Sequence, residues 1–243
     1  MIGRREPTAG HFIIAIDGPS GTGKSTVARR LAGELGAGYL DTGAMYRLVT
    51  LAVLRAGVDP NDDSAVAKVL QDLSFESPLR PEHQDHLLSG QDVSSEIRGP
   101  QVTLAVTPVS ANPAVRSWLF DRQQALAHSG RMVVEGRDIG TVIAPDADLK
   151  IYLTADAGER ARRRHRQDTA GTQNSATATG FTADIPDVTA VEKDLHRRDT
   201  HDSNRAHAPL QAADDAVVVD SSGLELPQTL AKVLELIASR GIR

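Results

Sequence analysis

Residues 12–25, FIIAIDGPSGTGKS, decide the fold of this chain. The apolar, isoleucine-rich run from Phe12 to Ile16 predicts a short strand that is buried on both faces of a parallel sheet. After Lys24, apolar residues on one helical face predict a helix that Gly36 ends: Val27, Ala28, Leu31, Ala32 and Leu35. Between these elements, Gly18–Ser25 matches Gly-x-x-x-x-Gly-Lys-Ser/Thr, so strand, glycine loop and helix follow one another as a phosphate-binding loop requires.

The residue types of this loop suit ATP as the ligand. Glycines let the backbone wrap closely around phosphates, so that successive N–H groups and the helix N-terminus face the anion. Lys24 would reach the β and γ phosphates, and Ser25 would offer its hydroxyl to Mg²⁺ bound with ATP. The alternative is a glycine-rich turn that binds nothing. We predict ATP contacts from Gly18, Pro19, Ser20, Gly21, Thr22, Gly23, Lys24, Ser25 and Thr26.

The rest of the chain continues the alternation of strands and helices. Further strands are expected at 39–40, 132–134, 149–153 and 216–219, and further helices at 44–56, 113–128, from 156 onwards and at 226–238. This pattern predicts an α/β fold of the P-loop NTPase type, with three layers around a central parallel sheet. The expected parts are a polar leader (1–10), a core (11–57 and 113–243), an inserted acceptor-binding lobe with small strands (58–112) and a lid region (156–200).

Composition excludes several classes of protein. The 243 residues carry a formal net charge of −5 and only 3% aromatic residues, so neither nucleic acid nor a membrane is an expected partner. The absence of cysteine excludes disulfides and thiolate metal sites, and the histidines form no metal-binding pair on a convincing helix. Because the apolar run near the N-terminus is too short for a signal peptide or a membrane span, we expect a cytoplasmic protein. We also expect the protein to be a monomer.

Two more segments follow strand ends, where ligands bind in open α/β folds. In 41–47, DTGAMYR, Thr42 lies near a helix start and Arg47 one turn further, which suits a site for an acceptor phosphate. A helix N-cap with a solvated arginine would explain the same residues. In 135–141, EGRDIGT, Arg137 and Asp138 place opposite charges beside glycines, although a local surface ion pair would also explain them.

Five segments together resemble the bacterial cytidylate kinase family. They are GPSGTGKST, DTGAMYR, DVSSEIRGPQVTLAVTPVSANPAVR, EGRDIGT and RRDTHDSNRAHAPL, in the family's order along nearly the whole chain. The combination of GRD at 136–138 with the pattern from Arg198 to Leu210 is narrow to this family. The resemblance implies a nucleoside monophosphate kinase that transfers the γ-phosphoryl group of ATP to CMP or dCMP.

The resemblance also implies a CMP site. The acceptor phosphate would be held by Arg47, Arg137 and Arg205. Cytosine would be read by Thr107, Arg116 and Asp138. The ribose would be surrounded by Tyr46, Arg198 and Asp202, and Thr42 would lie nearby. The family usually has serine where Thr42 and Thr107 stand, so each adds a methyl group beside the hydroxyl.

The chemistry of cytosine suits these residue types. A carboxylate can accept from the N4 amine while an arginine donates to O2 and N3, and arginine forks bind two phosphate oxygens at once. Uracil would set its O4 against Asp138, and two facing acceptors cost roughly 1 to 3 kcal/mol if unpaired. UMP should therefore be the poorer acceptor.

An arginine-rich helix from Asp156 would form the lid of such a kinase. Arg160, Arg163 and Arg164 share one helical side, and closure would bring arginine charge to the transferring phosphoryl group and exclude water. A solvated basic face is the alternative, which we expect for Arg162 and Arg166. The stretch 169–182 cannot bury much surface and is expected to be mobile. Catalytic roles are assigned to Lys24, Arg137, Arg160 and Arg164.

Two other functions stay open from the sequence. A small-metabolite kinase acting on shikimate or gluconate would not need Arg116 and Asp138 to read a base. A non-catalytic ATP-dependent switch would bind ATP without releasing ADP in response to an acceptor. A GTPase is disfavoured because the chain lacks the Asn-Lys-x-Asp motif that reads guanine.

Overall fold

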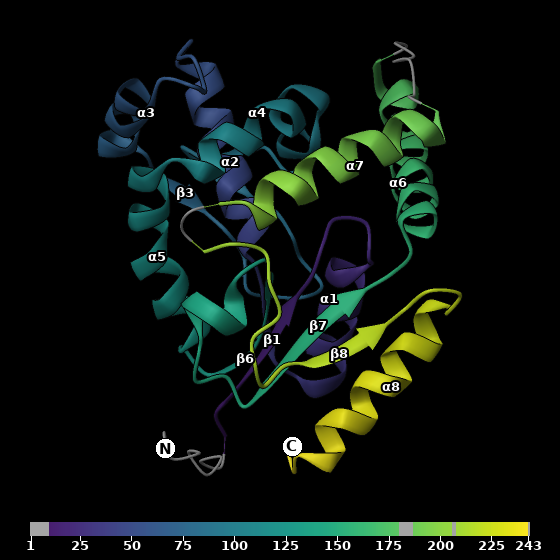
Figure 1. Cartoon of the computed structure of the whole chain (residues 1–243). Coiled ribbons are helices and arrows are strands. Elements are labelled where there is room, and N and C mark those ends of the chain that lie inside the picture. The colour runs from purple at the N-terminus through teal and green to yellow at the C-terminus, as the bar shows by residue number, and fades with distance from the viewer. Residues whose placement is uncertain (1–9, 180–186, 206–207, 243) are drawn as a thin grey trace.

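A parallel sheet of five strands forms the centre of the protein (Figure 1). The computed structural model describes residues 10–179, 187–205 and 208–242, so residues 1–9 of the expected leader lie outside the described residues. The strand order is β2-β6-β1-β7-β8, and every neighbouring pair is parallel, as predicted. The strands are β1 (Phe12–Asp17), β2 (Gly38–Asp41), β6 (Arg131–Gly136), β7 (Leu149–Thr154) and β8 (Val217–Asp220).

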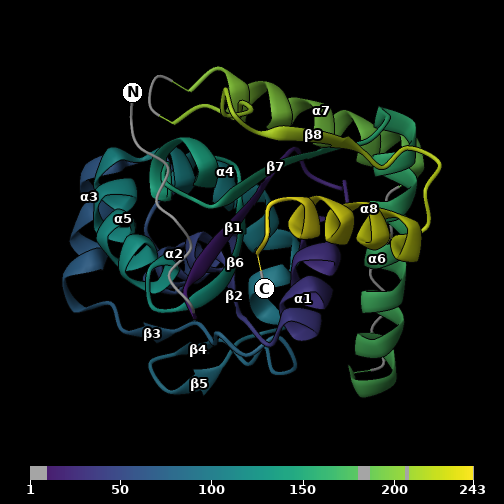
Figure 2. The ribbon, with the colours of Figure 1, turned by 90° about the horizontal axis from the view of Figure 1, so that it is seen from below.

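Helices cover both faces of this sheet. Figure 2 shows α1 (Lys24–Leu35) and α8 (Leu226–Ser239) on one side, and α2 (Thr42–Arg55) and α5 (Pro113–Ala127) on the other. In β1, Phe12, Ile14 and Ile16 pack into the first layer, while Ile13 and Ala15 pack into the second. Because successive side chains of a strand point to opposite faces, a strand between two helical layers must be apolar at every position. The unbroken apolar run of β1 has this cause.

The segment 58–112 contains small elements that pack on α2. They are α3 (Asp63–Val69), a 3-10 turn (Leu70–Asp72), the antiparallel strands β3 (Phe75–Glu76), β4 (Leu87–Leu88) and β5 (Gln91–Asp92), a second turn (Glu96–Arg98) and α4 (Pro100–Ala111). The expected small strands are thus confirmed. A separate apolar cluster joins the segment to α2: Ala44, Leu48, Leu51, Leu88, Val93, Ile97 and Val102. The sequence predicted no helix at the position of α4, which contains Pro108, a residue type that usually breaks a helix.

Two helices, α6 (Ala157–Thr179) and α7 (Val188–Ser203), make up most of the predicted lid region. They pack together through Ala161, Val191 and Leu195, and α7 crosses over the end of the sheet where β1 leads into α1 (Figure 1). The composition of 169–182 suggested a segment without regular structure, but its backbone is helical as far as Thr179. Its mobility stays a prediction, and residues 180–182 lie outside the described residues. No described helix combines the length and apolar character that crossing a membrane requires.

Candidate active site

The phosphate-binding loop turns sharply between β1 and α1. Gly18 has φ 145°, and a Cβ atom there would lie 2.0 Å from the carbonyl oxygen of Leu153. Gly21 has φ 81°, and its Cβ would lie 2.9 Å from the carbonyl oxygen of Arg160. Neither position tolerates a side chain without backbone movement. Lys24 Nζ donates to the carbonyl oxygen of Pro19 at 2.8 Å, so the lysine folds back over the loop.

Two buried carboxylates at strand ends lie beside this loop, and neither was assigned a role from the sequence. Asp17 accepts hydrogen bonds from the backbone N–H groups of Ile139 and Gly140 at 2.9 and 2.8 Å. Glu135 accepts from Ser25 Oγ at 3.0 Å and from the Tyr39 hydroxyl. Both residues could have been noticed, because Asp17 ends β1 directly before the phosphate-binding loop and Glu135 opens the segment EGRDIGT near the end of β6.

Burial shifts the pKa values of these groups toward their neutral forms. It raises the pKa of Asp17 to about 6 and that of Glu135 to about 7, and it lowers the pKa of Lys24 to about 7. Such shifts cluster at functional sites. Ser25 is exposed and has the Glu135 carboxylate beside it, so this pair offers the oxygen ligands that Mg²⁺ prefers. Among the described residues, no group of three His, Cys, Asp or Glu side chains could hold a metal ion.

Arg47 points into the segment 58–112 and is not a solvated arginine. Its Nη1 donates to the carbonyl oxygen of Ile97 at 2.9 Å and to Thr103 Oγ1 at 3.0 Å. Its pKa is lowered to about 9, mainly by burial and then by the nearby charges of Arg164, Arg198 and Arg98. Several positive charges gathered in one buried place favour an anion there.

Asp41, rather than Thr42, caps α2, because the Asp41 side chain accepts from the backbone N–H of Ala44 at 2.8 Å. The buried Thr42 hydroxyl donates to the carbonyl oxygen of Glu135 at 2.7 Å. Thr42 therefore joins the start of α2 to β6.

Arg116 of α5 and Asp138 after β6 meet as a buried ion pair, 22 residues apart in the chain. A surface ion pair is therefore the wrong description of Asp138, whose side chain is 8% exposed. Its pKa is raised by burial, against the opposing effect of Arg116. Thr107 of α4 is also buried. A hollow of about 310 Å³ adjoins the ion pair and is lined by Tyr46, Arg116, Ser117, Phe120, Val142, Ile143 and Ala208.

The end of α7 joins the remaining arginines. Asp202 accepts from Arg137 Nε at 3.0 Å and from Arg205 Nη2. Arg198 Nη2 donates to the carbonyl oxygen of Thr103 at 3.2 Å. Ser110 of α4, which the sequence did not single out, links a predicted phosphate ligand to a predicted base reader. Its hydroxyl accepts from Arg205 Nη2 at 2.9 Å, and its carbonyl oxygen accepts from Arg116 Nη1 at 3.4 Å.

Arg137 connects this acceptor side to the phosphate-binding loop. Its Nη2 donates to Ser20 Oγ at 2.6 Å, while its Nε binds Asp202. Within the described structure, the buried Nε atoms of four arginines have no hydrogen-bond partner. One is Arg131 of β6, and the other three belong to this site, namely Arg160, Arg198 and Arg205. Buried donors of this kind call for a ligand or ordered water.

Helix α6 carries arginine to both halves of the site. Arg160 Nη1 donates to the carbonyl oxygen of Ser20 at 3.1 Å, and Arg164 lies close enough to Arg47 and Arg198 to lower the pKa of each, after burial as the main cause. Arg163 instead binds the carbonyl oxygens of Thr22, Ser221 and Leu224 at 3.2, 2.8 and 3.1 Å, which fixes the base of the helix. The side chains of Arg162 and Arg166 are 60% and 72% exposed, as expected.

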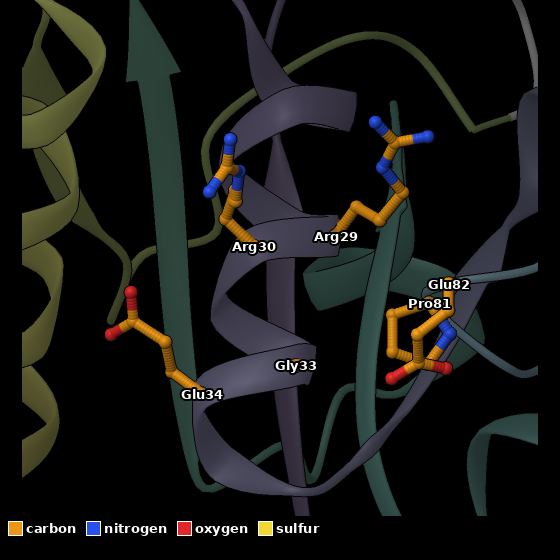
Figure 3. Close-up of a pocket in the computed structure, with 6 residues that line it drawn as sticks. All are labelled: Arg29, Arg30, Gly33, Glu34, Pro81 and Glu82. Atoms are coloured by element: carbon orange, nitrogen blue, oxygen red, sulfur yellow. The ribbon is translucent and has the colours of Figure 1, made fainter.

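A second hollow, of about 440 Å³, lies on the outer face of α1 and beside residues 81–82. Figure 3 shows that Arg29, Arg30 and Glu34 point away from α1 in different directions while Glu82 comes from a neighbouring segment, so the charged side chains do not converge on one point. Gly33 and Pro81 complete the lining. This mixed-charge surface has none of the convergence found around Arg137.

A family model described as cytidylate kinase matches residues 14–239 of the chain. The chain belongs to the cytidylate kinase family. Proteins named cytidylate kinase from Rhodococcus opacus, Mycolicibacterium paratuberculosis and Corynebacterium glutamicum are 51%, 50% and 48% identical to it. These matches cover 94%, 94% and 97% of this chain, and 96%, 96% and 98% of the three relatives.

Membership of the cytidylate kinase family confirms the resemblance seen in the five sequence segments and makes the chain a phosphotransferase. It argues against a non-catalytic switch and against a kinase of shikimate or gluconate. The contacts described above bring the predicted readers of ATP and CMP to one end of the sheet, while the role of each residue stays a prediction.

Proposed function

We propose that this member of the cytidylate kinase family transfers the γ-phosphoryl group of ATP to CMP or dCMP, giving ADP and CDP or dCDP. The observation that carries the proposal is the link from the phosphate-binding loop through Ser20 and Arg137 to the acceptor side. This link would join the site for the ATP phosphates to the site for the acceptor. The acceptor site contains the buried Arg116–Asp138 pair, whose charges suit the hydrogen-bonding edge of cytosine.

Catalysis would rest on positioning and charge stabilisation, with direct in-line transfer and no phosphoenzyme. Lys24 and the backbone N–H groups of the loop would hold the donor phosphates. Arg47, Arg137 and Arg205 would orient the acceptor phosphate, whose own oxygen is the nucleophile. Arg160 and Arg164 would offset negative charge as the phosphoryl group moves between the two sites.

The base would be read by opening the Arg116–Asp138 pair. Asp138 would accept from cytosine N4, and Arg116 would donate to O2 and N3, so each keeps a charge-assisted hydrogen bond. Thr107 would add a hydroxyl at the base, while Tyr46, Arg198 and Asp202 would surround the ribose. Uracil would leave Asp138 facing an acceptor, which predicts discrimination against UMP.

Mg²⁺ would enter with ATP and supply charge neutralisation between phosphate oxygens. Ser25 would hold it, and the Glu135 carboxylate that now accepts from Ser25 Oγ at 3.0 Å lies ready to orient that hydroxyl or a bound water.

We also propose that the segment 58–112 and the region 156–200 close over the two nucleotides, and that the enzyme acts as a monomer in the cytoplasm, where ATP and CMP are found.

A coupled assay of ADP release tests the proposal, with CMP, dCMP, UMP, AMP, shikimate and gluconate as separate acceptors. CMP and dCMP should give the highest kcat/KM, UMP a lower value, and the two non-nucleotides none. ADP release that is indifferent to CMP would contradict the proposed function.

A further inference from the structure

Asp199 of α7 places a carboxylate at the phosphate-binding loop. Its Oδ1 accepts a hydrogen bond from the backbone N–H of Ser20 at 3.3 Å, and its Oδ2 accepts one from Arg160 Nη1. The other two polar atoms of Ser20 are held by arginines, since Oγ accepts from Arg137 at 2.6 Å and the carbonyl oxygen accepts from Arg160 at 3.1 Å. The carboxylate therefore sits where a loop N–H group and a guanidinium converge.

These are the partners that a phosphoryl group needs. Backbone N–H groups of a glycine-rich loop and arginine forks bind carboxylate and phosphate oxygens by the same chemistry. A carboxylate and a phosphoryl oxygen cannot occupy the same donors together, because both carry negative charge. A phosphoryl group of ATP bound in the loop would therefore compete with Asp199 for these donors.

We propose that Asp199 is a positioning residue that stands in for a phosphoryl oxygen at Ser20 until ATP displaces it and takes over Arg160. This inference rests on the proposed function of the loop. The side chains of Arg160 and Asp199 are only 12% and 16% exposed, so an unpaired guanidinium there would be costly. Asp199 balances the charge of Arg160 and holds it at the loop. Displacement of Asp199 by the nucleotide uses part of the free energy of nucleotide binding.

Nucleotide affinity gives the sharpest test. Isothermal titration with Mg²⁺ and a non-hydrolysable ATP analogue would compare the wild type, Asp199→Asn, Asp199→Glu and the matched control Glu192→Gln, which removes the same charge two turns away on α7. We expect Asp199→Asn to bind the analogue about 3- to 10-fold more tightly, because the competing charge is gone. Asp199→Glu and Glu192→Gln should stay within about twofold of the wild type.

A gain in affinity separates this inference from a merely structural role, since loss of a supporting contact would weaken binding. Equal or weaker binding by a folded Asp199→Asn variant would overturn it. A crystal structure of the wild type with the same analogue gives a second test that needs no variant. A phosphate oxygen should then accept from the N–H of Ser20, and a carboxylate of Asp199 that still held this N–H group would also overturn the inference.

The proposed function can fail separately. If the wild type bound no analogue, the assignment of the phosphate loop would be wrong. If it bound the analogue but released no ADP in response to CMP, the proposed acceptor would be wrong. Normal turnover of the wild type, with unchanged affinity in Asp199→Asn, would reject only the role of Asp199.

Discussion

The donor and acceptor halves of the site are built in opposite ways. The donor half is one continuous segment between β1 and α1, Gly18–Ser25, whose backbone N–H groups would face the phosphates of ATP. The acceptor half is assembled from side chains of α2, α4, α5, α7 and the loop after β6. Backbone recognition of phosphate is indifferent to the acceptor, whereas side chains must read its base. Substitutions in the donor half should therefore affect all acceptors equally, and those in the acceptor half should discriminate.

The largest effect is expected from Lys24→Ala, which removes the loop cation that we propose holds the donor phosphates. The turnover number should fall on the order of a thousandfold with CMP and by the same factor with UMP. A coupled ADP assay at saturating substrates measures both, and Lys68→Ala, an exposed lysine of α3, serves as the control. Full activity in Lys24→Ala would show that the loop does not hold the transferred phosphate.

Asp138→Ala should break the acceptor half selectively. The value of kcat/KM for CMP should fall about a hundredfold, and for UMP by less, because UMP does not gain from the carboxylate. Asp138→Asn sharpens the test, since its amide N–H group can donate to uracil O4 and should raise the UMP to CMP ratio further. Equal losses with both acceptors in both variants would contradict the base-reading role.

Asp202→Asn should have a moderate effect, because Asp202 orients Arg137 and Arg205 and does not itself donate a hydrogen bond to phosphate. We expect KM for CMP to rise about tenfold, while KM for ATP stays within about twofold. Initial rates with each substrate varied in turn give both constants, and Asp121→Asn, an exposed carboxylate of α5, is the control. A rise confined to KM for ATP would place Asp202 with the donor half.

The smallest effect concerns the stability of the segment 58–112. His86 is 1% exposed, and burial lowers its pKa below the usual 6.5, with Arg98 acting in the same direction against Asp41, Asp92 and Asp85. As the pH falls, His86 is therefore protonated in the unfolded chain before it is protonated in the folded protein. Its contribution to the free energy of unfolding is fully present above pH 6.5 and is lost as the pH falls through the lower folded pKa. The free energy of unfolding of the wild type should fall by on the order of 1 kcal/mol from this cause between pH 7 and 5.5, and His86→Leu should not show this fall.

Urea unfolding at the two pH values measures this difference. His83→Leu, a substitution of an exposed histidine three residues earlier, should keep the full pH dependence. If both variants lost stability with pH as the wild type does, His86 would not be the group that titrates.

The donor half could be predicted from the sequence because its geometry is local. The apolar run of β1, the glycines of the loop and the apolar face of α1 each follow from spacing within residues 12–36, and Gly36 ends α1 as expected. The candidate readers of CMP came from family motifs, because nothing in local spacing relates Arg116 to Asp138. Composition misled at 169–179, whose backbone is helical despite its polar residues.

Only the tertiary structure decided which strand ends meet. Strand β6 comes after β1 and β2 in the chain, yet it lies between them, so Glu135 pairs in register with Ile16 on one side and with Asp41 on the other. This insertion brings Glu135 to Ser25, and the crossing of α7 brings Asp199 to Ser20. Local propensity and spacing determine each element, but contacts between residues more than a hundred positions apart depend on strand order and helix packing, which no local pattern encodes.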